Sequence, residues 1–205
     1  MRNFTVQLIA AAAFTTTAWA QLPRECFFVT EMHGFGDDDF TDLLSDLPTL
    51  MSMYKPGMRL KSITSMQDPD EDNRLTGLQV DLITEQGKTL QLPMVGAQLD
   101  EWGSQKLHFK MQQPDKISIL TDKELAGVCD VVIYQGTKIT SLSKDPRNCL
   151  PEEEGIEETW LSLPEDTPLV GFHGKSDGEV LNSLGLILLN KTDPVCQKPL
   201  SKGQF

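Results

Sequence analysis

Hydrophobic and polar residues alternate one by one through most of the chain beyond position 58. Successive side chains of a β-strand point to opposite faces, so this period of two predicts short strands with one buried face. The alternating segments span residues 59–64, 75–84, 88–92, 106–111, 117–120, 130–134, 138–143, 160–163, 169–172 and 184–189. Turn-forming residues separate them, and no helix of ordinary length interrupts the series. The pattern therefore predicts an all-β fold, an antiparallel sandwich, barrel or prism, rather than a βαβ enzyme fold.

Residues 21–57 follow a different pattern and are expected to form an N-terminal extension. Apolar residues spaced by three and four positions are typical of one face of a helix. The residues with this spacing are Phe40, Leu43, Leu44 and Leu47. Asp37–Asp39 precede them, which places carboxylates at the positive end of the helix dipole. The sequence therefore predicts a short amphipathic helix, ended or restarted at Pro48, that caps one open end of the β domain.

Residues 1–20 have the features of a secretory signal peptide. Arg2 supplies the basic start, an apolar stretch runs from Phe4 to Phe14, and Ala18 and Ala20 are the small residues that signal peptidase requires. The apolar stretch is too short to cross about 30 Å of hydrocarbon. We therefore expect cleavage after residue 20 and a secreted protein, located outside the cell or in a secretory granule.

The charge of the chain argues against two classes of partner. Acidic residues outnumber basic ones 30 to 18, for a formal net charge of −12. A nucleic acid or an anionic membrane needs a basic face that displaces counterions, so we expect no nucleic-acid partner and no membrane insertion. The sequence contains neither a nucleophile elbow nor a phosphate-binding loop, and abundant carboxylates alone do not indicate a glycosidase. We therefore do not expect an enzyme.

Four cysteines lie beyond residue 20. An even number of cysteines in a secreted chain predicts two disulfides, and four cysteines allow three pairings. We favour a Cys129–Cys149 bridge, which closes a local loop. The remaining Cys26–Cys196 bridge would join the two ends of the domain, which often lie close together.

No metal or other cofactor is expected. The cysteine spacing matches no zinc-binding pattern, and the chain has three His in total. The acidic run 68–73 lacks the Gly and the Glu that a calcium loop of the EF-hand type requires, because Asn73 and Gln79 occupy those positions. We interpret this run and the one at 152–158 as solvated loops.

Residues 169–188 resemble the closing segment of the jacalin-related lectins. They read LVGFHGKSDGEVLNSLGLIL, where the family has a strand I-V-G-F-H-G, a loop R-S-G-x-x-L-D and a strand A-I-G-V-Y-L. Similarity at the level of pattern extends over residues 58–190. The resemblance implies a β-prism I domain over 58–190, made of three four-stranded antiparallel Greek-key sheets, and leaves residues 191–205 as a C-terminal tail.

The same resemblance implies a sugar-binding loop after the first of these strands. In the family, backbone amides of a G-x-x-x-D motif donate to sugar hydroxyls and the Asp accepts from them. The motif falls on residues 178–182, with Asn182 at the Asp position, and losing that charge would cost about 1–2 kcal/mol of binding unless Asp177 or Glu179 supplies the carboxylate. The expected carbohydrate-binding residues are Lys175, Ser176, Asp177, Gly178, Glu179, Val180 and Asn182.

Two hypotheses follow for the function. The first is a secreted, non-enzymatic lectin that binds glycans or glycoproteins through residues 175–182. The second is a secreted structural or granule-matrix protein that keeps the jacalin-like fold and has lost sugar binding. The identity of the sugar and the formation of a homo-oligomer are left open by the sequence.

Two tryptophans and one asparagine carry further expectations. Trp102 lies in a predicted loop and is a candidate aromatic contact for a sugar, because loop aromatics are common at binding sites. Trp160 alternates with Leu161 and Leu163 and is expected in the core or at a prism edge. Asn190 begins an Asn-Lys-Thr sequon, so we expect it to be glycosylated in a secreted chain.

Overall fold

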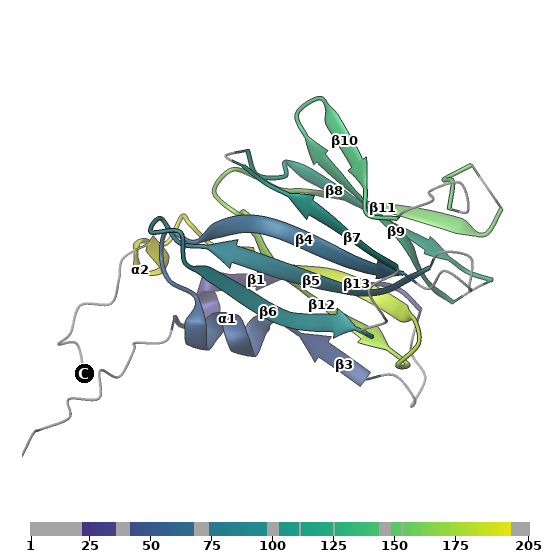
Figure 1. The fold of residues 1–205 in the computed structure, drawn as a ribbon, viewed down its shortest axis with the longest axis horizontal. Coiled ribbons are helices and arrows are strands. Elements are labelled where there is room, and N and C mark those ends of the chain that lie inside the picture. The colour runs from purple at the N-terminus through teal and green to yellow at the C-terminus, as the bar shows by residue number, and fades with distance from the viewer. Residues whose placement is uncertain are drawn as a thin grey trace, which may run out of the picture.

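The computed structural model describes residues 22–35, 42–67, 74–97, 103–110, 112–124, 126–143, 149–152 and 154–197. Over these residues the chain forms three antiparallel sheets around one main core (Figure 1). The first sheet contains β1 (Phe27–Val29), β2 (His33–Gly34), β3 (Asp42–Ser45), β12 (Leu169–Ser176) and β13 (Leu181–Leu189). The second contains β4 (Arg59–Gln67), β5 (Leu75–Ile83), β6 (Thr89–Gly96) and β7 (Ser104–His108). The third contains β8 (Lys116–Asp122), β9 (Gly127–Gln135), β10 (Lys138–Ser141) and β11 (Ile156–Ser162).

Each sheet has four strand positions. The orders are β6-β5-β4-β7 in the second sheet and β10-β9-β8-β11 in the third, so in each the fourth strand returns beside the first, which is the Greek-key arrangement. In the first sheet the order is β1-β13-β12-β3, and β2 also pairs with β13, on the same edge as β1. The predicted all-β fold of three four-stranded antiparallel sheets is confirmed.

The core consists of the apolar residues that the alternation marked as inward-facing. Fully buried examples from the three sheets are Leu60, Ile63, Leu78, Val80, Leu82, Ile117, Ile119, Val131, Ile133, Phe172, Leu184 and Leu186. Burying one such side chain stabilises the fold by about 1.5–3 kcal/mol. The period of two is therefore the sequence signal of this core.

The described residues of the 21–57 segment, 22–35 and 42–57, contribute β1, β2 and β3 to the first sheet, instead of forming a separate extension. β1 pairs with β13, and the edge continues where the N–H of Thr30 donates to Leu186 O (3.0 Å) and that of Phe35 to Asn182 O (2.9 Å). On the opposite edge, β3 pairs with β12. The segment thus supplies both edge strands that β12 and β13 need, and pairing both edges of this central hairpin satisfies its backbone groups.

The prediction of an amphipathic helix around residues 40–47 is wrong. Residues 42–45 are strand β3, and the helix α1 (Leu47–Met53) begins only afterwards. Pairing with the edge of β12 overrides a helical spacing that spans barely two turns. Pro48 lies in the first turn of α1, where its missing N–H costs no hydrogen bond, so it starts the helix and does not end it. Residues 37–40 lie outside the described residues.

α1 lies beside β12 and β6, with its Leu50 in the core. Gly171 of β12 permits the approach, because a Cβ there would lie 2.9 Å from Asp46 Cβ and 3.0 Å from Leu50 Cδ1. The Tyr54 ring meets Phe27 edge-on, with ring centroids 6.0 Å apart. α1 therefore fixes the start of β12, which leads to the predicted binding loop.

Two disulfides join Cys26 to Cys196 and Cys129 to Cys149, with Cα–Cα distances of 5.4 and 5.9 Å. These are the two pairs favoured above. Cys26 closes the short 3-10 helix η1 (Arg24–Cys26) and Cys196 lies in α2 (Pro194–Gln197). Within the predicted tail, the described residues up to 197 are therefore held against the body of the protein. None of the described helices has the length and apolar character needed to cross a bilayer.

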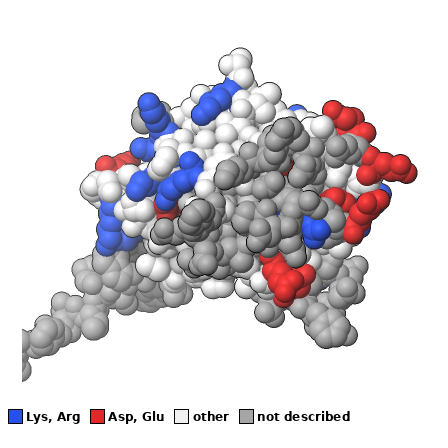
Figure 2. Space-filling view, turned by 45° about the vertical axis from the view of Figure 1, so that its right-hand side comes forward, with Lys and Arg blue, Asp and Glu red and all other residues white. Residues whose placement is uncertain are grey.

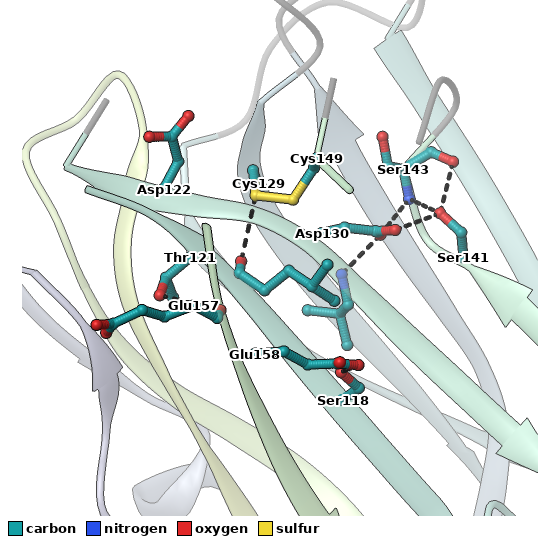
Figure 3. Close-up of a disulfide and its surroundings, with 12 residues drawn as sticks. Ser118, Thr121, Asp122, Cys129, Asp130, Ser141, Ser143, Cys149, Glu157 and Glu158 are labelled. Atoms are coloured by element: carbon teal, nitrogen blue, oxygen red, sulfur yellow. Dashed lines mark hydrogen bonds between the residues drawn. A yellow bond between two sulfur atoms is a disulfide. The ribbon is translucent and has the colours of Figure 1, made fainter. Parts of the chain in front are cut away.

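The second disulfide lies beside a buried polar cluster of the third sheet (Figure 3). The Asp130 carboxylate, 1% exposed, accepts hydrogen bonds from Ser141 Oγ (2.6 Å), Ser143 N–H (2.8 Å) and Val131 N–H (2.7 Å). Burial nevertheless raises the pKa of Asp130, because desolvation outweighs these bonds. The cluster ties the end of β10 to β9, next to the bridge.

Candidate functional site

The loop of residues 177–180 joins β12 to β13 at one end of the first sheet (Figure 1). Gly178 has a φ of 95°, in the left-handed region where a side chain would be strained. Among the described residues, and apart from its two neighbours in the chain, none has an atom within 4 Å of the place that a Cβ of Gly178 would take. The backbone conformation, and not a lack of space, therefore calls for glycine here.

Asp177 is the hydrogen-bonding centre of this loop. Its Oδ1 accepts the N–H groups of Glu179 and Val180, both at 2.9 Å, and its Oδ2 accepts Asn182 Nδ2 at 3.2 Å. Partial burial opposes ionisation, but the bonds from Val180, Glu179 and Asn182 outweigh it and hold the pKa of Asp177 below its ordinary value. Asp177 is therefore a fixed, ionised carboxylate whose residue stays exposed.

Asn182, at the position of the family's Asp, is buried and fully engaged. The residue is 7% exposed, and its Oδ1 accepts the N–H of Asp177 at 2.9 Å. Its Nδ2 donates to Asp177 Oδ2 and to the carbonyl of Ala126, each at 3.2 Å. Ala126 lies in the β8–β9 turn with a φ of 48°, a conformation that few non-glycine residues adopt. Asn182 thus anchors the loop to the third sheet.

The four consecutive amides of residues 177–180 all donate within the loop. Besides the three bonds described, the N–H of Gly178 donates to Ser176 Oγ at 3.1 Å, and this hydroxyl donates to Val180 O at 2.8 Å. Ser176 is itself 2% exposed. The loop is consequently rigid, and its amides are already satisfied.

The structure unites most of the residues predicted to form the site and leaves two beside it. The residues joined by the hydrogen bonds of the loop are Ser176, Asp177, Gly178, Val180 and Asn182. The side chain of Glu179 is exposed, and Lys175 is half-buried on β12. Among the predicted side-chain acceptors, the carboxyl groups of Asp177 and Glu179 therefore face solvent, and only the first is fixed in place.

Trp102 lies outside the described residues. Trp160 is 45% exposed on β11, an edge strand of the third sheet, so of the two places expected for it the core is excluded and the edge agrees. Leu163 is buried and Leu161 packs against the core, so the alternation turns residue 160 outward. The alternation of the sequence alone would have predicted that the Trp160 side chain faces solvent.

A buried carboxyl group that the sequence did not mark belongs to Asp46, between β3 and α1. Asp46 is 0% exposed; its Oδ2 accepts the N–H of Phe172 at 2.9 Å, and its Oδ1 has no hydrogen-bond partner among the described residues. Burial raises the pKa of Asp46 to about 7, and the bond from Phe172 only partly opposes this rise. Asp46 precedes Leu47 and Pro48, a sequence that predicts the start of a helix. No neighbouring residue indicates that the Asp46 carboxyl group lies against β12.

Two hollows lie far from the loop, at the opposite end of β13. One, of about 320 Å³, lies between α1 and the β5–β6 hairpin, where Tyr54, Met58 and Leu90 line it. The other, of about 440 Å³, adjoins Leu189 and Cys196. Neither hollow is lined by a predicted site residue.

Charge is unevenly spread over the surface. Figure 2 shows acidic side chains gathered toward one edge of the face in view and Lys and Arg toward the opposite edge. Lys106 forms an ion pair with Asp81 at 2.7 Å in the second sheet, and Lys123 pairs with Glu157 at 2.5 Å at the end of the third. Both pairs involve exposed lysines, so they contribute little to stability.

Comparison with known proteins identifies the fold of the chain by structural similarity. No protein-family model and no curated protein matches the sequence. A mannose-binding jacalin-related lectin from Ananas comosus aligns over 80% of this chain and 98% of its own, with a TM-score of 0.55 and 16% identity. Artocarpin in complex with mannotriose aligns over 78% and 96%, at 0.55 and 16%. Single-chain recombinant jacalin aligns over 79% and 93%, at 0.56 and 13%. The chain therefore has the β-prism I fold of the jacalin-related lectins.

Proposed function

We propose that this protein is a secreted glycan-binding protein, and that Asp177 is the residue through which the β12–β13 loop accepts sugar hydroxyl groups. The observation that carries the proposal is the fixed, ionised and exposed carboxylate of Asp177, hydrogen-bonded to the Asn that stands at the family's Asp position. A carboxylate offers about four lone pairs, and loop donors use three of those of Asp177. One acceptor position on Oδ2 remains for a hydroxyl group.

Two structural neighbours support mannose oligosaccharides as the first probe. The lectin from Ananas comosus is described as mannose-binding, and artocarpin was solved with mannotriose. Because the amides of residues 177–180 are engaged, we expect the loop to act mainly as an acceptor. Such a site binds more weakly than one that also donates.

The test of this proposal is the Asp177→Asn variant. Its amide oxygen can still accept the N–H groups of Glu179 and Val180, which puts the amide NH2 at the Oδ2 position, so the acceptor for a sugar hydroxyl, and for Asn182 Nδ2, is replaced by a donor. We expect the affinity for mannotriose, measured by isothermal titration calorimetry, to fall roughly tenfold, which corresponds to about 1.4 kcal/mol. The matched control is Glu165→Gln, which removes an exposed carboxylate from the β11–β12 connection. Equal affinities in the two variants would show that Asp177 is not the acceptor.

One observation favours the second candidate, a structural or granule-matrix protein without sugar binding. All four amides of residues 177–180 and the whole Asn182 side chain are engaged inside the protein. A glycan array with and without calcium separates the candidates. Binding to no glycan, together with calcium-dependent self-association in sedimentation velocity, would support the second candidate and exclude the first.

Secretion leads to a prediction for Asn190. Its Oδ1 accepts the N–H and the Oγ1 of Thr192, at 3.0 and 2.5 Å, in a half-exposed turn after β13, and two disulfides are consistent with an oxidising compartment. We expect expression through a secretory pathway to attach one N-linked glycan there. Digestion with an endoglycosidase should then increase the electrophoretic mobility of the protein. Thr192→Ala, which keeps Asn190 but breaks the sequon, should abolish the shift, and a shift that persists in this variant would contradict the assignment.

A further inference from the structure

Two aromatic rings lie next to each other on the outer face of the third sheet. Tyr134 of β9 and Trp160 of β11 have ring centroids 5.2 Å apart and ring planes at 48°. Trp160 is 45% exposed, and Ile139 of β10, which pairs with Tyr134, is 63% exposed. The Tyr134 and Trp160 rings come from β9 and β11, the two strands on either side of β8, and Ile139 adjoins Tyr134 on its other side. Exposed apolar groups that adjoin in this way mark interaction surfaces more often than isolated ones do.

Charged groups of opposite sign lie among these rings. The ammonium of Lys116 lies 3.3 Å from the Trp160 ring centroid and 5.3 Å from that of Tyr134, within the range of cation–π attraction. The Glu158 carboxylate accepts a hydrogen bond from the buried Ser118 (Figure 3). No ion pair joins Lys116 to a carboxylate in the described part of the chain. One donor and one acceptor, each charged, are thus held beside an apolar surface.

We propose that this aromatic patch (Lys116, Tyr134, Glu158 and Trp160) is a second binding site, which takes a pyranose ring of a neutral glycan. A pyranose ring has one face of C–H groups and hydroxyl groups at its rim. Because the Lys116 ammonium covers one face of Trp160, the C–H face of the sugar lies against the ring surface that Lys116 leaves exposed. The Glu158 carboxylate accepts from these hydroxyls and the Lys116 ammonium donates to them. A neutral ligand uses both charges, whereas an anionic ligand would face Glu158 and a cationic ligand would face Lys116.

The size of the patch favours a sugar over a protein partner. A stable protein interface buries about 800 Å² on each side, with a hydrophobic centre. An aromatic side chain buries about 150–250 Å², and both Tyr134 and Trp160 are already partly covered. Two rings and one aliphatic side chain are too small an apolar centre for such an interface. They match the area of one or two sugar rings.

The aromatic patch is separate from the β12–β13 loop. Lys116 lies at the start of β8, and Ala126, which contacts Asn182, lies in the turn after its end. The 7 residues of β8 extend over about 20 Å at ~3.3 Å per residue, and the patch runs along the strand from Lys116, which pairs with Tyr134 at the far end, to Glu158, which pairs with Leu120. The two sites can therefore be occupied together, and each can be removed without the other.

The experiment uses the mature chain and an array of neutral oligosaccharides built from mannose, galactose, glucose and N-acetylglucosamine. All variants carry Asp177→Asn, which removes the loop acceptor. We expect this background to keep binding to a subset of neutral glycans, and Trp160→Ala to lower that binding at least tenfold. Phe28→Ala is the matched control, because Phe28 is an equally exposed aromatic residue (47%) on β1 of the first sheet. Far-UV circular dichroism verifies that each variant is folded.

The possible outcomes separate this inference from the function proposed for the loop. Loss of binding in Trp160→Ala, with Trp160→Phe restoring most of it, supports the aromatic patch. Complete loss of glycan binding in the Asp177→Asn background supports the loop and overturns the patch. Unchanged binding in Trp160→Ala also overturns it, as does a Trp160→Ala variant that changes only the oligomeric state in sedimentation velocity, which would identify a contact between copies of the chain.

Discussion

Asp46→Asn is expected to raise the free energy of unfolding at pH 8 by about 4 kcal/mol, while leaving it nearly unchanged at pH 4. The Asp46 carboxyl is fully buried between β3 and α1, and its pKa is raised from 3.8 to about 7. At about 1.36 kcal/mol per pKa unit, ionising it in the folded protein costs about 4 kcal/mol more than in the unfolded chain. Asn resembles the protonated acid and keeps an acceptor for the N–H of Phe172, so it removes this cost.

Whether the free energy of unfolding rises or falls with pH depends on whether the folded or the unfolded protein binds more protons. Between pH 3.8 and about 7, the folded protein holds a proton on Asp46 that the unfolded chain has lost, so stability falls as the pH rises. The contribution of the neutral carboxyl is complete below pH 3.8 and is lost as the pH rises through about 7. Asp130, whose pKa is also raised, acts in the same direction, whereas Asp81 and Asp177, whose pKa values are lowered, act in the opposite one.

Urea unfolding of the wild type and the variant at several pH values measures this effect, because the other carboxyl groups cancel in the difference between the two proteins. Asp166→Asn, the same chemical change at an exposed residue of the β11–β12 connection, is the control. The stability gain of Asp46→Asn should grow steadily from pH 4 to pH 8. A gain that does not change with pH would mean that Asp46 is already ionised in the folded protein.

Removing the Cys26–Cys196 disulfide by replacing both cysteines with Ser is expected to lower the free energy of unfolding by about 5 kcal/mol. The bridge joins residues 170 positions apart, and closing so long a loop removes much of the conformational entropy of the unfolded chain. The bridge also holds the end of η1, from which β1 begins, against α2. Its loss therefore weakens the edge that β1 provides for β13.

The second disulfide provides the comparison for this prediction. Cys129 and Cys149 are 20 positions apart, so replacing both with Ser is expected to cost about 3 kcal/mol. Urea unfolding of the two double variants, each with the other bridge intact, gives both values. A larger loss from the 20-residue loop than from the 170-residue loop would show that chain entropy is not the dominant contribution.

Much of the fold could be predicted because its signals are local. The alternation in β4, β5, β8 and β9 sets the inward faces, and residues 169–188 indicate the prism. The strands β1, β2 and β3 have three, two and four residues, which is too short to show a period. Their partners β12 and β13 lie more than 100 positions along the sequence, so only the folded sheet reveals why they extend.

The candidate site divides in the same way. The motif located the loop and the exchange of Asp for Asn, because both are visible in consecutive residues. The burial of Asn182 depends on Ala126, 56 positions away, and could not be predicted from the motif. The tyrosine and tryptophan of the aromatic patch come from strands that pair through β8, so their proximity is likewise a property of the sheet order.

The bridge between Cys26 and Cys196 also decides how the protein would bear mechanical load. If the chain is pulled from its two ends, tension entering at residue 26 passes through the sulfur atoms directly to residue 196. The strands between these positions carry no tension, because the disulfide, a covalent bond in parallel with them, bears the force. A molecule built in this way can be stretched by its termini without any of its sheets being sheared apart, until the bridge is reduced.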